Sequence, residues 1–278
     1  MSFGIFLAVM FAAVLHASWN AIIKFGHNKL QGMMVLSVSQ GLMGLAIVVV
    51  YPLPRVEAWG WLLASGILHT LYKVFLTFAY QRGDLSRVYP IARGTAPMLV
   101  ALIGAYFLDD EMRGTDYVGI FLVGCGILLM ARGVFTNGES RALIPFALAS
   151  AMATAGYSLV DGVGARISGD AWLYVAWLFV LDGVIFLTLG LLHSGHHVLS
   201  KNTKAWGLGT VAGAASFGAY AIAVWAMTVA PIALVTALRE TSVLFAVVIG
   251  LVFFREKADR GKLVAAAVIA CGIALTRI

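Results

Sequence analysis

The chain has 278 residues, of which 61% are apolar and 12% are charged, and its formal net charge is +6. This balance excludes an ordinary soluble domain, because such domains carry about 25% charged residues. The basic residues stand singly between apolar segments, which does not support nucleic-acid binding. We therefore interpret the chain as an integral membrane protein.

Ten apolar segments follow one another along the chain. Each is about 18–25 residues long, and at about 1.5 Å rise per residue a helix of that length crosses a hydrocarbon core of about 30 Å. Membrane strands need only about ten alternating residues, so the segments favour an all-α membrane protein. The predicted transmembrane helices cover residues 3–24, 31–51, 58–80, 85–108, 115–132, 142–162, 170–192, 204–228, 231–254 and 259–277.

One sequence unit occurs twice. Shifting the chain against itself by 146 residues aligns residues 84–132 with 230–278 without a gap and gives identical residues at ten of 49 positions. The identical pairs include Arg93/Arg239, Thr95/Thr241, Gly104/Gly250 and the run Cys125-Gly126-Ile127 with Cys271-Gly272-Ile273. Shared apolar composition does not place a charged residue in register with such a run. The match therefore indicates an internal duplication.

The duplication predicts two domains of five helices each, residues 1–135 and 141–278. Because five is an odd number, the second copy enters the membrane from the opposite side, and the repeats are inverted. This arrangement is typical of secondary transporters, whose substrate sites lie near the middle of the membrane between the repeats. The connections on one side hold twelve Lys and Arg residues and those on the other side hold four, which by the positive-inside rule places both termini outside the cytoplasm.

Arg93 and Arg239 are charged residues inside predicted membrane helices. Each is the ninth residue of its helix, about 13 Å from the start at about 1.5 Å per residue. Two converging guanidinium groups can hold a carboxylate, phosphate or phosphonate through charge-assisted hydrogen bonds. The alternative is that each arginine pairs with an acid of the protein itself. The acids available inside predicted helices are Asp161, Asp182 and Glu240.

The third predicted helix carries a polar face. His69, Tyr72 and Lys73 follow helical spacing, and such a face is expected to point to the interior and not to lipid. Lys73 either adds positive charge to a substrate site or extends toward the membrane surface.

The first predicted helix has a similar face, formed by His16 and Asn20 with Trp19 beside them. His16 is either a proton-responsive group or a structural histidine bonded to a backbone carbonyl. Trp19 either lines a cavity or packs.

The three acids and two prolines have candidate roles in coupling and gating. An acid that is desolvated between helices can exchange protons near neutral pH, so Asp161, Asp182 and Glu240 are candidates for coupling transport to protons; otherwise they neutralise the buried cations. Pro90 and Pro97 each remove a backbone donor from the fourth helix. We expect this helix to bend and to act as the gating or substrate-contacting element.

The sequence offers no support for enzyme chemistry, a metal site or a cofactor. His193, His196 and His197 stand in a predicted loop without a nearby cysteine or acid. Cys125 and Cys271 occupy equivalent positions, and we interpret both as small packing residues beside a glycine.

With this layout the chain resembles the drug/metabolite transporter superfamily, EamA type. The connections Asp109-Asp110-Glu111 and Arg255-Glu256-Lys257, each followed by a glycine-bearing last helix, are similar to that family's repeat ends. The stretches His16 to Asn20 and Val88 to Pro97 are similar to a subgroup associated with phosphonate utilisation.

The resemblance implies that the first four helices of each repeat line a central cavity. It places on cavity-forming helices the residues Arg93, Arg239, Lys73, His69, His16 and Asn20. It also implies cytosolic termini, in conflict with the charge count.

We therefore expect a multi-pass secondary transporter of a bacterial-type inner (plasma) membrane, acting as a monomer or homodimer. Its substrate would be a small polar metabolite with an acidic group, such as an amino acid or organophosphonate, moved by alternating access. In this hypothesis Arg93 and Arg239 hold the anion, Lys73 adds positive charge, and the polar residues of the first and third helices orient the rest. A channel or membrane receptor with the same cavity is the alternative.

Overall fold

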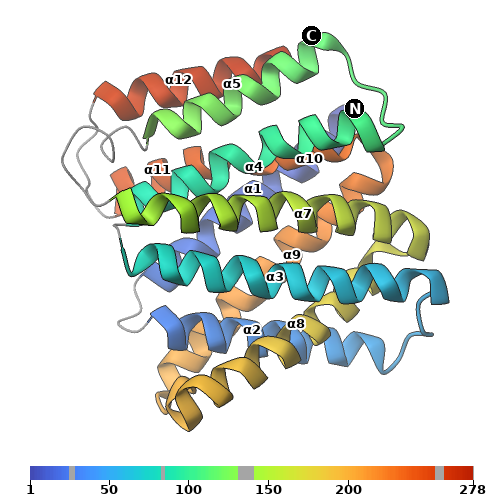
Figure 1. The fold of residues 1–278 in the computed structure, drawn as a ribbon, viewed down its shortest axis with the longest axis vertical. Coiled ribbons are helices and arrows are strands. Elements are labelled where there is room, and N and C mark those ends of the chain that lie inside the picture. Colours follow the sequence, from blue (N-terminus) through green and yellow to red (C-terminus); the bar gives the residue numbers. More distant parts are fainter. Residues whose placement is uncertain (25–28, 83–84, 131–140, 254–259, 278) are drawn as a thin grey trace. The chain divides into compact units, whose positions relative to one another are not determined.

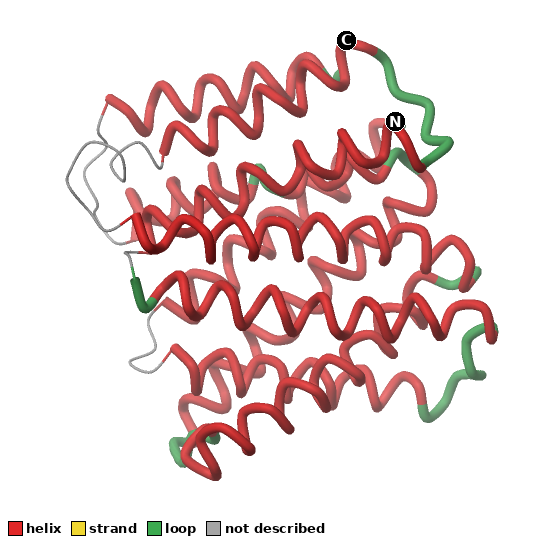
Figure 2. The backbone as a smooth tube through the Cα atoms, in the orientation of Figure 1, coloured by secondary structure: helices red, strands yellow, loops and turns green. Residues whose placement is uncertain are grey.

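The computed structural model describes residues 1–24, 29–82, 85–130, 141–253 and 260–277. Within these ranges the regular elements are helices (Figure 2). The α-helices are α1 (Phe3–Lys24), α2 (Lys29–Val48), α3 (Trp59–Tyr80), α4 (Leu85–Phe107), α5 (Gly114–Met130), α7 (Ile144–Ser168), α8 (Ala171–Ser194), α9 (Thr203–Val229), α10 (Ile232–Arg239), α11 (Ser242–Phe253) and α12 (Arg260–Leu275).

The all-helical fold with ten membrane helices is confirmed for the described residues, with α10 and α11 together forming the ninth. Eight segments are long and apolar enough to cross a membrane. The last helix of each repeat is shorter, with 17 residues in α5 and 16 in α12. Prediction of the ninth helix as one uninterrupted element was wrong, because α10 ends at Arg239 and α11 begins at Ser242.

The chain forms two compact units, and each unit takes helices from both predicted repeats. The first unit comprises Met1–Ser2, Leu71–Leu159 and Val229–Ile278, and the second comprises Phe3–Thr70 and Val160–Thr228. Two helices, α3 and α7, contribute residues to both units. The predicted division between residues 135 and 141 and the connection Arg255-Glu256-Lys257 fall largely on residues 131–140 and 254–259, outside the described part of the chain.

In the first unit, α5 and α12 lie side by side (Figure 1), and glycines allow their close approach. A Cβ atom at Gly126 would lie 3.1 Å from the carbonyl oxygen of Ala265, and one at Gly272 would lie 2.7 Å from that of Gly119. The two contacts are equivalent, because Gly272 corresponds to Gly126 and Gly119 corresponds to Ala265 after the shift of 146 residues. Such reciprocal contacts are those of a two-fold related pair, as expected for a duplicated unit.

The cysteines next to these glycines do not have the packing role that we expected from the sequence. Cys125 and Cys271 are both exposed and both carry free thiols. The glycines face the neighbouring helix, and the cysteines, one residue away, point outward. An exposed side chain in a membrane helix of this kind faces its surroundings and not the core.

In the second unit, α2 packs against α8, whose start is fixed by local chemistry. Gly169 adopts φ 77°, which glycine reaches without strain, and Asp170 follows as the N-cap. The Asp170 carboxylate accepts hydrogen bonds from the backbone N–H groups of Trp172 at 2.9 Å and Leu173 at 3.1 Å. This cap sets the first turn of α8 and thereby the position of Tyr174.

Candidate functional site

The two duplicated arginines meet on one carboxylate in the first unit. Arg93 comes from α4 and Arg239 is the last residue of α10, and both are buried. Nη1 of Arg93 lies 3.0 Å from Oε1 of Glu240, and Nη2 of Arg239 lies 3.3 Å from the same oxygen. Glu240 itself is 0% exposed. The sequence left open whether the arginines bind substrate or pair with an acid of the protein. In this structure they pair with an acid of the protein, and both pair with the same one.

Two tyrosines complete a closed ring of contacts with these three residues. The Cζ atom of Arg93 lies 5.9 Å from the ring centroid of Tyr72, and that of Arg239 lies 5.9 Å from the ring centroid of Tyr157. The tyrosine rings meet edge to face, with centroids 5.8 Å apart. Aromatic faces attract guanidinium groups most strongly where water is excluded. We call Arg93, Arg239, Glu240, Tyr72 and Tyr157 the arginine cluster.

The ionisable groups of the arginine cluster sum to a positive charge. Two guanidinium groups contribute +2 and one carboxylate contributes −1, so the net charge is +1 when all three are ionised. The second oxygen, Oε2 of Glu240, is buried and has no hydrogen-bond partner among the described residues. Buried charges are costly in a membrane unless they are paired, so a net positive cluster of this kind favours a further anion.

The arginine cluster forms where the ninth membrane helix is interrupted, between α10 and α11. The N–H of Thr241 bonds to the carbonyl of Leu238 at 3.1 Å, that of Val243 to Glu240 at 3.1 Å and that of Leu244 to Thr241 at 2.8 Å. This i to i−3 spacing is tighter than an α-helix and often marks a functional site. The hydroxyl of Thr241 also donates to the Leu238 carbonyl at 2.6 Å and so competes with the regular backbone bond.

Lys73 belongs to the same unit as the arginine cluster. It follows Tyr72 on α3 and is 6% exposed, so it is buried and does not extend to the surface. Its presence gives the buried interior of the first unit a third cationic side chain.

Pro90 and Pro97 are buried in α4, which continues through both. The predicted gating role of these prolines stays a prediction, and a break between helices occurs in the second copy, between α10 and α11.

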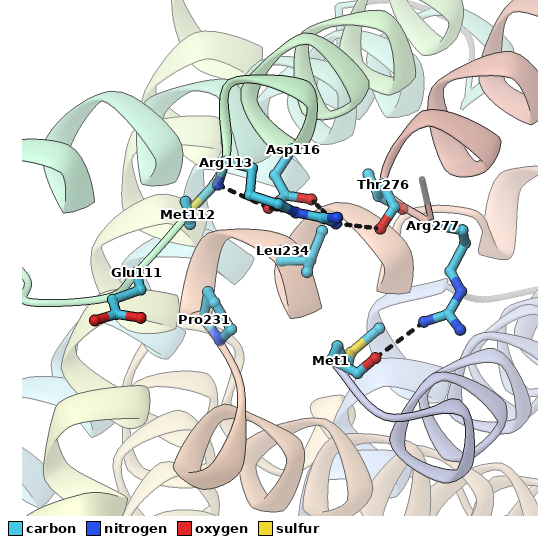
Figure 3. Close-up of a pocket in the computed structure, with 9 residues that line it drawn as sticks. All are labelled: Met1, Glu111, Met112, Arg113, Asp116, Pro231, Leu234, Thr276 and Arg277. Atoms are coloured by element: carbon cyan, nitrogen blue, oxygen red, sulfur yellow. Dashed lines mark hydrogen bonds and ion pairs between the residues drawn. The ribbon is translucent and has the colours of Figure 1, made fainter.

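A half-open cavity of about 550 Å³ lies at the other end of α10 (Figure 3). It is lined by Met1, Glu111, Met112, Arg113, Asp116, Pro231, Leu234, Thr276 and Arg277. Leu234 precedes Arg239 by five residues, a rise of about 8 Å along the helix. The N–H of Ile232 donates to Asp110 at 2.8 Å, which anchors the start of α10 to the segment after α4.

Both arginines that line this cavity have partners within it. Arg113 donates to Oδ1 of Asp116 at 3.1 Å and to the carbonyl of Thr276 at 3.4 Å, and Arg277 donates to the carbonyl of Met1 at 3.1 Å (Figure 3). The hydrogen bond to Asp116 raises the pKa of Arg113, so this arginine stays charged. We therefore place the candidate site at the arginine cluster and regard the cavity as an approach to α10.

A second buried cluster lies in the second unit. The carboxylate of Asp161 on α7 accepts a hydrogen bond from the hydroxyl of Tyr174 at 3.1 Å and another from the hydroxyl of Tyr220. Nε2 of His69 lies 3.1 Å from the same carboxylate. Asp161 is 0% exposed. The structure thus joins His69 and Asp161 and adds two tyrosines that we did not identify from the sequence.

The remaining predicted residues lie in the second unit. On α1, the indole N–H of Trp19 donates to Nδ1 of His16 at 3.3 Å, and the amide of Asn20 donates to the His16 carbonyl at 2.8 Å. Trp19 packs on Leu36 of α2. Asp182 is buried on α8.

Comparison with known families identifies the chain. A model of the EamA-like transporter family matches residues 2–132 and matches again at residues 142–278. The chain belongs to this family. Its members are membrane transporters and not enzymes, so this EamA-like protein is a multi-pass membrane transporter of the drug/metabolite transporter superfamily.

Solved structures share the fold of the EamA-like protein. Among 28 similar chains, one described as "Crystal structure of protein" has a TM-score of 0.76, covers 99% of this chain and 98% of its own length, and is 16% identical. At that identity the likeness shows the fold alone. No curated protein matches the chain.

Proposed function

We propose that this EamA-like protein is a secondary transporter for a small polar metabolite with an acidic group, and that the acidic group binds at Arg93 and Arg239. One observation carries the proposal: two arginines from duplicated positions converge on a single buried carboxylate and leave a net positive charge. An anionic substrate group would pair with the guanidinium groups beside Glu240 or in its place. Arginine suits this role because its planar donors match carboxylate and phosphonate oxygens.

The interrupted helix supports the same proposal. In secondary transporters, substrate groups bind where membrane helices are discontinuous, because the broken turn leaves backbone groups for ligands. Here Arg239 ends α10 and Glu240 precedes α11, so both charged residues stand at the interruption. Because Glu240 caps α10, movement of α10 relative to α4 would alter the contact between Glu240 and Arg93, which fits an alternating-access cycle.

The chemistry of the arginine cluster suits a carboxylate, phosphate or phosphonate group of the substrate. An amino acid or an organophosphonate fits, and the similarity of His16 to Asn20 and of Val88 to Pro97 to the phosphonate-associated subgroup favours the second. We also propose that the protein lies in a bacterial-type inner membrane. Neutral analogues of each compound should bind weakly, because they leave the net charge of the arginine cluster unchanged.

Thermal unfolding of the purified protein tests the proposal. The panel consists of amino acids, alkylphosphonates and sugar phosphates, each with a neutral ester or amide analogue. A compound at 100 times its dissociation constant stabilises the folded state by about 2.7 kcal/mol. We expect stabilisation by acidic compounds only, and its loss in Arg93→Ala and in Arg239→Ala. Arg82→Ala is the matched control, since Arg82 is exposed and bonds to the carbonyl of Phe78.

Transport by protein reconstituted in liposomes separates the alternatives. Counterflow of a radiolabelled compound identified in the panel requires bound substrate to exchange across the membrane, which a channel or a receptor does not support. Retained stabilisation in both arginine variants would remove the role of the arginine cluster. Rapid equilibration without counterflow would favour a channel.

A further inference from the structure

We propose that Asp161, with His69, Tyr174 and Tyr220, binds the proton that drives transport. This inference rests on the proposed transport function and adds its coupling ion. We call these four residues the aspartate cluster. They come from four helices, α7, α3, α8 and α9, and His69 and Tyr220 also pack edge to face with centroids 5.2 Å apart.

The charge of the second unit favours proton uptake at this place. Among the residues described for this unit, no Lys or Arg is buried, while Asp161 and Asp182 both are. With a neutral His69 and an ionised Asp161, the aspartate cluster carries −1 in a region where burial penalises charge. One added proton brings the cluster to zero, either as an O–H on Asp161 or as an N–H on His69. The proton belongs to the pair, because the two groups are in direct contact.

The hydrogen-bond geometry favours a proton over a metal cation. Both tyrosine hydroxyls donate to the carboxylate, and Nε2 of His69 lies between Oδ2 of Asp161 and the hydroxyl of Tyr220, at 3.1 Å and 3.3 Å. The two tyrosine hydrogens and the contact with His69 therefore take up most of the roughly four lone-pair sites of the carboxylate. Hard cations require several oxygen lone pairs directed at one point. A proton needs a single acceptor.

Three other ionisable groups on the helices of the aspartate cluster bear on it, and the first is the buried Lys73, four residues after His69 on α3. Asp182 lies on α8, eight residues after Tyr174 and beside Gly66 of α3. Arg166 lies on α7, five residues after Asp161, and its Nε donates to the carbonyl of Met227 at 2.9 Å. The described part of α2 from residue 30 to 48 contains no ionisable side chain. Asp182 is therefore the neighbouring acid that a test must separate from Asp161.

The helices that carry His69 and Asp161 also each carry a tyrosine of the arginine cluster. His69 and Tyr72 are three residues apart on α3, and Asp161 and Tyr157 are four apart on α7. Residues at these spacings share one face of a helix. The aspartate cluster and the arginine cluster thus each take one residue from α3 and one from α7.

Proton binding can be measured without any substrate. Proteoliposomes adsorbed on a solid-supported membrane are given a pH jump, and the transient charge displacement is recorded. We expect a transient in the wild type and its loss in Asp161→Asn. Tyr220→Phe removes one donor to the carboxylate and keeps the acid, so the response midpoint should move to higher pH by about one unit. Asp182→Asn is the matched control and should keep the transient.

Each other outcome contradicts the proposal. These are a transient that persists in Asp161→Asn, an unchanged midpoint in Tyr220→Phe, loss of the transient in Asp182→Asn, or a sodium jump at constant pH whose response depends on Asp161. Tyr220→Phe keeps the proposal testable if Asp161→Asn does not fold. Counterflow at equal pH does not need a proton gradient, so counterflow without a proton transient would refute only the coupling site. A proton transient without counterflow would refute only the proposed transport.

Discussion

The two copies of the duplicated unit differ most at the position that follows the shared arginine. In the first copy Arg93 precedes Gly94 in the continuous helix α4, and in the second copy Arg239 precedes Glu240, where the helix is interrupted. The cation is common to both copies and the acid occurs in one. The difference shows how a duplicated site acquires a net charge, since two arginines share one carboxylate.

Packing explains why the first copy keeps a glycine. A Cβ at Gly94 would lie 2.9 Å from the carbonyl oxygen of Gly124 and 3.0 Å from Cγ of Leu128, both on α5. Any side chain at this position must therefore displace the neighbouring helix. Close packing of α4 on α5 and an acid at residue 94 exclude each other, so only the second copy has room for the carboxylate.

Of the variants that test the difference between the two copies, removal of the Glu240 carboxylate should change stability most. Glu240→Gln keeps the volume but leaves two buried guanidinium groups without a carboxylate. Loss of one partner from a buried ion pair costs about 3–5 kcal/mol, so we expect a large drop in the free energy of unfolding. The cluster charge rises from +1 to +2, and acidic compounds should then stabilise the variant more than the wild type. Thermal unfolding with and without methylphosphonate measures both effects.

A contrary result would show that the acid does not set the charge of the site. Glu240→Gln of unchanged stability would mean that Arg93 and Arg239 are balanced elsewhere. A variant that folds but gains no extra stabilisation from an anion would separate Glu240 from substrate binding.

The fold could be predicted from the sequence because its signals are local. The length of each apolar segment gave the helices, and the register of Arg93 with Arg239 gave the duplication. Most predicted ends agree with the structure to within three residues, apart from the end of α7, which continues to Ser168. The helices depend on residues near one another in the chain, and the duplication is visible in the sequence without knowledge of any contact.

The candidate site could be predicted only in part, because its pairing is non-local. Glu240 bonds to an arginine 147 residues away, and Tyr220 donates to an acid 59 residues away. Tyr174 and Tyr220 have the aromatic character of packing residues, and only the assembled helices show where their hydroxyls point. The interruption between Arg239 and Ser242 has no proline within it, so no local sequence signal predicted it.

Filling the position of Gly94 should have an intermediate effect. Gly94→Ala forces α4 away from α5, and overpacking of this kind costs about 1–3 kcal/mol. Gly104→Ala on the same helix is the matched control, because its nearest contact is the flexible side chain of Leu108 at 3.4 Å. An alanine there should be neutral or slightly stabilising. Equal unfolding temperatures for the two variants would contradict the packing argument.

The smallest effect is expected where the two copies share a residue but differ in backbone. Thr241→Val removes the hydroxyl that donates to the Leu238 carbonyl, a loss of about 0.5–1.5 kcal/mol, and Thr95→Val makes the same change in the continuous α4. If the hydroxyl helps to hold the interruption, Thr241→Val should slow hydrogen exchange of the amides from 240 to 244, while Thr95→Val leaves the equivalent amides unchanged. If neither variant changes the exchange rates of these amides, the ion pairs of Glu240 with the two arginines would instead cause the interruption. The variant pair thus decides whether a hydroxyl or an ion pair breaks the helix.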